Sequence, residues 1–183
     1  MSTPELAPDE KAPTIFLVGF MGAGKSSVGL ALSRILGQPF EDLDDRIEAR
    51  ERRSIEEIFW QFGEPEFRRI EHAALHSLIQ GLASSSRVVA LGGGAFAQTQ
   101  NAALLEEAGF PVIFLDAPVD ELFRRCQEPQ LNRPLRRNLE EFRCLYEARR
   151  PCYLKASLRI ETGGKDVESV AREVIESLKL QSL

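Results

Sequence analysis

The chain has 183 residues, 43% of them hydrophobic and 28% charged, and its 23 Lys and Arg against 28 Asp and Glu give a net charge of −5. This composition is typical of one globular domain and excludes a largely disordered chain. The negative charge argues against a nucleic-acid-binding protein, which needs an excess of basic residues. Residues 124–150, however, hold eight arginines and four glutamates, a positive segment suited to an anionic ligand.

Residues 1–13 contain three prolines, three acidic residues and no apolar run, which predicts a disordered tail and no signal peptide. No apolar run is long enough to cross a bilayer, so we expect no membrane association. The three cysteines, Cys126, Cys144 and Cys152, lack CxxC spacing and fit reduced thiols. We therefore expect a cytoplasmic protein.

From residue 14 onward, short apolar runs alternate with helical patterns. Buried strands are predicted over 14–18, 87–91 and 112–115, with a short run at 39–40 and a short strand at 158–161. Helices are predicted over 25–36, 54–62, 65–82, 139–154 and 167–180; the second opens on a Ser54/Glu57 capping box and stops at Gly63. The fold class predicted for residues 14–183 is a single α/β domain. We expect a three-layer α/β/α sandwich around a mainly parallel five-stranded sheet.

A glycine-rich segment follows the first strand and leads into the first helix. Residues 19–26 read GFMGAGKS and match GxxxxGK[ST] in full. Backbone N–H groups of such a loop point at phosphate oxygens, and the helix N-terminus adds positive potential. The residues expected to bind the nucleotide are Gly22, Ala23, Gly24, Lys25, Ser26 and Ser27. The motif predicts binding of ATP or GTP, with Lys25 at the β/γ-phosphates and Ser26 on Mg²⁺.

A second glycine cluster, Gly92, Gly93 and Gly94, directly follows the predicted strand 87–91. Alone it is also compatible with a flexible turn. Ligands bind beyond the carboxyl ends of strands in open α/β sheets, however, and glycines allow a ligand to approach the backbone closely. The position therefore favours a binding role.

Further short motifs follow in a fixed order. They are DLD at 42–44, GEPEFRR at 63–69, GGGA at 92–95, RPL at 133–135 and RRPCY at 149–153. In order and spacing this series resembles shikimate kinase, a P-loop kinase of aromatic amino-acid biosynthesis, from residue 14 to the C-terminal helix. The resemblance implies a monomeric, ATP-dependent enzyme of the P-loop NTPase type, with Mg²⁺ as cofactor, ATP and shikimate as ligands, and a mobile lid near 126–138.

The resemblance also implies roles for individual residues. Asp42 corresponds to the carboxylate that holds Mg²⁺, and Asp44 to the residue that contacts the substrate hydroxyls and serves as base. Arg68 and Arg149 correspond to the arginines that bind the shikimate carboxylate, beside the Gly92–Gly94 backbone. Arg133 corresponds to the lid arginine that closes over the phosphates, and Arg125 to an arginine packed against adenine. Arginine suits a carboxylate because its planar fork donates paired hydrogen bonds.

Some residues have competing interpretations. Asp45 could take the role assigned to Asp44, and only one of Arg149 and Arg150 needs to face the site. Arg136, Arg137 and Arg143 have no assigned role and fit a solvated surface. His72 and His76 stand at i and i+4 on a helix, but HAALH lacks the glutamate of a zinc-protease motif.

Two other functions remain open from the sequence. A kinase for a gluconate-type or nucleotide-type acceptor would share the fold, but it would not explain Asp44, Arg68 and Arg149 together. A non-catalytic sensor would need an output module, for which 183 residues leave little room.

Overall fold

The computed structural model describes residues 12–127 and 138–180. At its centre lies a sheet of five strands in the order β2-β3-β1-β4-β5, and every neighbouring pair is parallel. The strands are β1 (Ile15–Val18), β2 (Phe40–Asp42), β3 (Val88–Ala90), β4 (Val112–Asp116) and β5 (Leu158–Glu161). The predicted five-stranded α/β fold is thereby confirmed, with a sheet that is wholly parallel within the described residues.

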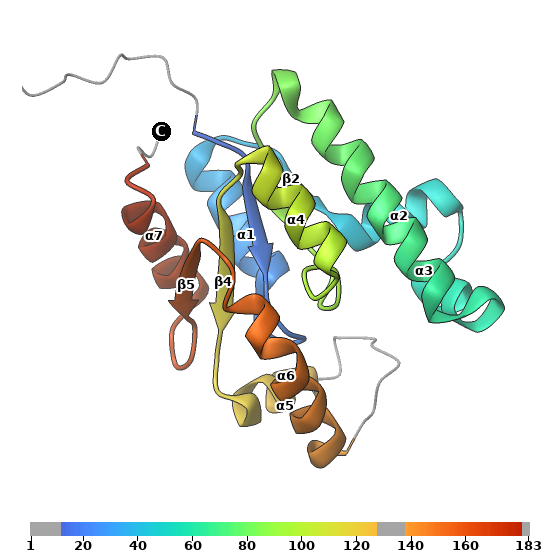
Figure 1. Cartoon of the computed structure of the whole chain (residues 1–183). Helices are drawn as coiled ribbons and strands as arrows, with labels where there is room; N and C mark the ends of the chain where they lie inside the picture. Colours follow the sequence, from blue (N-terminus) through green and yellow to red (C-terminus); the bar gives the residue numbers. More distant parts are fainter. Residues whose placement is uncertain (1–11, 128–137, 181–183) are drawn as a thin grey trace, which may run out of the picture.

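Helices flank this sheet on both sides. They are α1 (Lys25–Leu36), α2 (Leu43–Glu51), α3 (Ile55–Gln80), α4 (Thr99–Ala108), α5 (Val119–Cys126), α6 (Leu139–Tyr153) and α7 (Val167–Ser177), with a 3₁₀ turn at Gly81–Ser84. Helix α1 packs against α7, and α3 packs against α4. Figure 1 shows α1 and α4 on opposite sides of the central strands, with α5 and α6 beyond the carboxyl ends of β1 and β4.

The core explains why the central strands are continuous apolar runs. All four residues of β1 and all five of β4 are buried, because both faces of a parallel sheet are covered. The fifth residue of β4 is a buried aspartate, Asp116, which breaks the apolar pattern at the carboxyl end of the strand. This end of the sheet also carries both glycine clusters.

The structure differs from the sequence prediction in its helices. Helices α2, α4 and α5 were not predicted. The two helices predicted on either side of Gly63 are confirmed, however: they run end to end as α3 and are interrupted where Gly63 adopts a non-helical conformation at φ 78°. The Ser54/Glu57 capping box is present, and α1 ends at Gly37 as predicted.

The ends of the chain and the predicted lid are only partly described. Of the expected tail, Ala12 accepts a hydrogen bond through its carbonyl from Gln38 Nε2 at 2.6 Å. Of the expected lid at 126–138, Cys126 belongs to α5 and Asn138 caps α6; residues 128–137 lie outside the described residues. In the described part of the chain, the helices are too short or too polar to cross a membrane.

Candidate active site

The first glycine-rich segment forms a tight loop between β1 and α1. Gly19, Gly22 and Gly24 have φ angles of 147°, 78° and 86°, a region that favours glycine. A β-carbon at position 22 would lie 2.6 Å from the carbonyl oxygen of Leu122, so neighbouring backbone also requires glycine there. The loop therefore has the conformation of a phosphate cradle opening onto the N-terminus of α1.

Three polar side chains lie at the mouth of this cradle. Lys25 is buried, and its Nζ donates to the carbonyl oxygens of Gly19 at 2.9 Å and Phe20 at 3.1 Å. Ser26 Oγ donates to Asp42 Oδ2 at 3.1 Å, although the two residues are 16 positions apart in sequence. The structure thus brings together the two residues predicted to hold Mg²⁺.

A cavity of about 530 Å³ extends from the cradle in two directions. The residues predicted to bind ATP contribute Gly22, Ala23, Gly24, Lys25, Ser26, Ser27 and Arg125 to its wall. Asp42, Asp44, Gly92 and Gly93 line it as well. The cavity is therefore shared by the candidate nucleotide residues and part of the candidate acceptor site.

Arg125 lies at the nucleotide end of the cavity, held by elements distant in sequence. Its Nη1 donates to Gly22 O at 3.2 Å, and its Nη2 donates to Thr162 O at 3.1 Å and Glu121 Oε1 at 2.5 Å. These contacts fix the orientation of the guanidinium, a planar group of the kind that stacks on flat rings. Thr162, Lys165, Asp166, Val167 and Val170 complete this end of the cavity; sequence reasoning did not find them.

The second glycine cluster carries three candidate acceptor residues, one beside each glycine. A β-carbon at position 92 would lie 2.5 Å from Asp44 Oδ1, and one at position 94 would lie 2.5 Å from Arg68 Nη2. Arg149 Nη1 donates to the carbonyl oxygen of Gly93 at 3.5 Å. Both arginines lie outside the wall of the 530 Å³ cavity, next to its Gly93 side.

Arg68 is held in place by two glutamates of its own helix. Its Nη1 donates to Glu71 Oε2 at 2.8 Å and its Nη2 to Glu64 Oε1 at 3.0 Å. Burial by itself would lower the pKa of Arg68, but Glu71 and Glu64 outweigh it and raise that pKa. Burial raises the pKa of the Glu71 carboxyl more than Arg68 lowers it, since this side chain is only 1% exposed. Sequence reasoning assigned no role to Glu71, and the i,i+3 spacing to Arg68 was the available signal.

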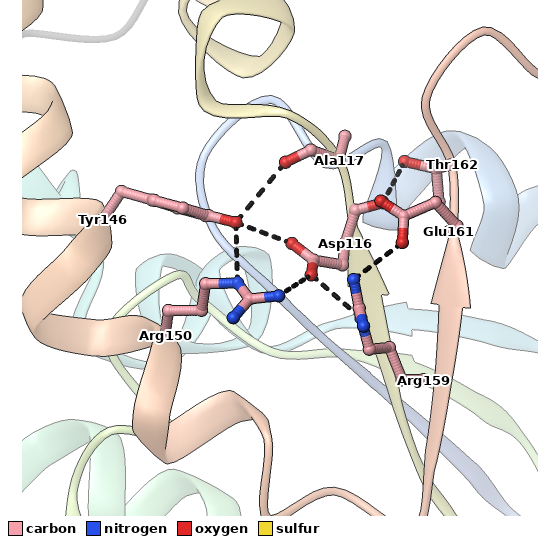
Figure 2. A network of polar contacts seen from close by, with 7 residues as sticks. All are labelled: Asp116, Ala117, Tyr146, Arg150, Arg159, Glu161 and Thr162. Atoms are coloured by element: carbon pink, nitrogen blue, oxygen red, sulfur yellow. Dashed lines mark hydrogen bonds and ion pairs between the residues drawn. The ribbon is translucent and has the colours of Figure 1, made fainter.

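Arg149 and the adjacent Arg150 face different partners. Arg149 points to Gly93, to whose carbonyl the Tyr153 hydroxyl also donates. Arg150 Nη2 instead donates to Asp116 Oδ2 at 2.9 Å (Figure 2). Of the two, the side chain at 149 is therefore the one that lies against the second glycine cluster.

Other candidate residues lie elsewhere. Arg133, Arg136 and Arg137 lie outside the described residues. Asp45 is exposed, and Arg143 makes a surface ion pair with Asp120 at 2.7 Å. His72 Nδ1 lies 2.7 Å from the side-chain oxygen of the buried Asn101, a hydrogen bond between α3 and α4.

A parallel sheet with this cradle and a separate arginine-rich subsite defines a P-loop phosphotransferase. The family model described as "Shikimate kinase" matches residues 21–179. Shikimate kinase of Caulobacter vibrioides is 44% identical over 162 residues, which cover 87% of this chain and 78% of that protein. The chain belongs to the shikimate kinase family.

Solved structures agree. Shikimate kinase from Acinetobacter baumannii in complex with shikimate matches with a TM-score of 0.83 and 32% identity, over 91% of this chain and 93% of that one. The crystal structure of shikimate kinase from Aquifex aeolicus matches with a TM-score of 0.79 and 35% identity, over 91% and 96%.

Proposed function

We propose that this protein transfers the γ-phosphoryl group of ATP to the 3-hydroxyl of shikimate, giving ADP and shikimate 3-phosphate. Family membership supports the reaction. The observation that carries the assignment of residues is the glycine triplet, where Asp44, Arg149 and Arg68 contact positions 92, 93 and 94 in turn. Two guanidinium groups at one end suit a carboxylate, and a carboxylate at the other end suits a hydroxyl.

The residues act mainly by placing the two substrates, since phosphoryl transfer depends largely on positioning and charge neutralisation. Lys25 binds the β- and γ-phosphates within the cradle. Asp44 orients the attacking hydroxyl and accepts its proton as the new P–O bond forms and the bond to the ADP oxygen breaks. Arg133, on the resemblance, adds positive charge at the phosphates.

The residues at the cradle also fit a magnesium ion. The hydroxyl of Ser26 and the carboxylate of Asp42 both carry hard oxygen atoms, and the two lie 3.1 Å apart at the mouth of the cradle. These two residues would hold Mg²⁺, which when bound neutralises phosphate charge. Glycine backbone, Ser27 and Arg125 then hold the rest of the nucleotide.

Release of ADP from Mg·ATP with a panel of acceptors tests the proposed reaction. The panel contains shikimate, gluconate and a nucleoside monophosphate, with a reaction without acceptor as the baseline. We expect turnover with shikimate alone. If shikimate gave only the baseline rate while another compound turned over, the proposed function would be wrong.

Arg68→Ala tests the carboxylate subsite. Because a charge-assisted hydrogen bond contributes about 1.5–3 kcal/mol, we expect the KM for shikimate to rise about tenfold to a hundredfold, with the KM for ATP nearly unchanged. Arg69→Ala is the matched control, since Arg69 is the next residue and pairs with Glu66 at the surface. An equal rise of the KM values for shikimate and ATP in Arg68→Ala would contradict the assignment of Arg68 to the carboxylate subsite.

A further inference from the structure

Asp116, the last residue of β4, is contacted by α6 and by β5 together with the residue that follows it (Figure 2). Its side chain is only 2% exposed. Its Oδ1 accepts from the Tyr146 hydroxyl at 2.8 Å, and its Oδ2 accepts from Arg150 Nη2 at 2.9 Å and Arg159 Nε at 3.0 Å. A buried carboxylate with three donors is held in one position, because each hydrogen bond offsets part of the free energy that its desolvation costs.

Two of the three donors come from α6 and lie one helical turn apart. Tyr146 and Arg150 are at i and i+4, so they project from the same face of the helix. They also contact each other, since Arg150 Nε donates to the Tyr146 hydroxyl oxygen at 3.0 Å. Burial and Asp116 raise the pKa of Tyr146 to about 12, and the hydroxyl therefore remains a donor at neutral pH. Asp116 thus binds one complete turn of α6.

Arg149 occupies the position on α6 next to Arg150 but has a different partner. Successive residues of an α-helix are rotated by about 100° from one another. When Arg150 is bound to Asp116, Arg149 is turned toward the carbonyl oxygen of Gly93, 3.5 Å away. Rotation of α6 about its axis would move both arginines together.

We propose that Asp116 is a positioning residue that fixes the rotation of α6 through Tyr146 and Arg150 and so directs Arg149 to the acceptor carboxylate. The proposal rests on the proposed function, in which Arg149 binds that carboxylate. It adds a buried residue that does not line the cavity and acts through α6.

The two arginines on Asp116 provide a matched pair of variants. Arg150 and Arg159 both bind Oδ2, at nearly equal distances, and both are partly exposed. Arg150 lies on α6, however, while Arg159 lies on β5 and also binds Glu161 at 2.7 Å. Removal of either arginine takes one donor from the Asp116 carboxylate, but only removal of Arg150 breaks a contact that holds α6.

The first experiment compares Arg150→Gln with Arg159→Gln in steady-state kinetics and thermal unfolding. We expect the KM for shikimate to rise about tenfold in Arg150→Gln, because a misplaced Arg149 guanidinium binds the substrate carboxylate more weakly. We expect the KM for ATP to stay within about twofold in both variants and the KM for shikimate to stay so in Arg159→Gln. A similar fall of Tm in the two variants would show that stability alone does not explain the difference.

The second experiment places Arg150→Gln in an Arg149→Ala background. If Arg150 acts through Arg149, the two effects on kcat/KM for shikimate are not additive, and Arg150→Gln lowers it less than about twofold once Arg149 is absent. Arg150→Lys keeps the charge but lacks the planar fork whose separate nitrogens bind Tyr146 and Asp116, so we expect an intermediate KM.

The outcomes separate the two proposals. Failure of the wild-type protein to phosphorylate shikimate contradicts the proposed function. Turnover by the wild type, together with equal KM values for shikimate in Arg150→Gln and Arg159→Gln, overturns only the positioning role. Full additivity of Arg150→Gln and Arg149→Ala overturns it as well.

Discussion

Asp44 and Asp45 are neighbours with different surroundings. Asp44 lines the central cavity and lies against Gly92, while Asp45 is exposed on α2. Both begin the same helix, so the two carboxylates see a similar helix dipole. A comparison of variants at these two positions therefore measures the effect of a carboxylate in the cavity wall against that of an exposed one on the same helix.

We expect Asp44→Asn to lower kcat about a hundredfold or more, because an amide cannot accept the proton of the attacking hydroxyl. Asp45→Asn should keep a kcat close to that of the wild type. Steady-state kinetics with saturating shikimate and ATP measures both. A normal kcat in Asp44→Asn would contradict the role assigned to Asp44. A greater loss of kcat in Asp45→Asn would assign that role to Asp45 instead.

A substitution in the glycine triplet tests the site in a way that should change substrate binding more than stability. A β-carbon in Gly94→Ala would meet the guanidinium of Arg68, the flexible end of a side chain, so the fold can adjust while the binding group moves. We expect the KM for shikimate to rise about tenfold with a small change in Tm.

Two other glycines serve as controls for the expected rise in the KM for shikimate. At Gly93 the nearest atom to a new β-carbon would be 3.7 Å away, so Gly93→Ala should have the smallest effect in the triplet. At Gly81 nothing lies within 4 Å, and Gly81→Ala should leave both KM values unchanged. A change in KM as large in Gly81→Ala as in Gly94→Ala would show that contact with Arg68 is not the cause.

At the scale of elements, an ion cluster joins the edge strand β2 to its neighbours. Glu41 on β2 accepts from Arg46 on α2 at 2.5 Å and from Arg87, just before β3, at 2.6 Å. Burial by itself would raise the pKa of Glu41, but Arg46 and Arg87 outweigh it and lower that pKa below its usual 4.5. The ionised carboxylate therefore stabilises the edge that carries Asp42 and Asp44.

This shift predicts the pH dependence of the stability. A carboxyl whose pKa is lower in the folded chain contributes stability above its unfolded pKa and loses it as the pH falls through the folded value. We expect Glu41→Gln to lower Tm at pH 7, and the difference from the wild type to shrink below about pH 4.5. Glu107→Gln, at an exposed position on α4, is the control; a Tm difference for Glu41→Gln independent of pH would contradict the role of its charge.

The sequence predicted the long elements well and the short helices poorly. Periodicity needs a window of about 11–18 residues. Helix α5 has eight residues, of which only Leu122 is buried, and α2 buries only Leu43 and Ile47. These helices form because the neighbouring strand ends and the core fix their position. This stabilisation comes from tertiary packing, so a local sequence pattern does not reveal it.

The candidate site was predictable where a motif names the residue, as for Lys25, Asp44 and Arg68. Residues that act through another side chain were missed. Glu71 and Asp116 are buried carboxylates, and in sequence they resemble ordinary surface acids. Only the fold shows that Glu71 pairs with Arg68 and that Asp116 pairs with Arg150 and Arg159.

At the scale of the whole molecule, three of the five arginines that the structure describes in the segment 124–150 have an acidic partner. Arg125 pairs with Glu121, Arg143 with Asp120 and Arg150 with Asp116. The net charge of −5 is therefore compatible with anion binding, because the site depends on where a few cations point and not on their number.

The sheet order also separates the site into halves with different structural origins. The strand β1 leads into the glycine-rich cradle and residues after β5 line the same cavity, whereas the residues proposed to bind the acceptor follow β2 and β3 or come from α3 and α6. A protein engineer could therefore rewrite the acceptor half, strand end by strand end, and leave the phosphate donor half intact. The same division would let evolution exchange one acceptor for another without rebuilding the machinery that handles ATP.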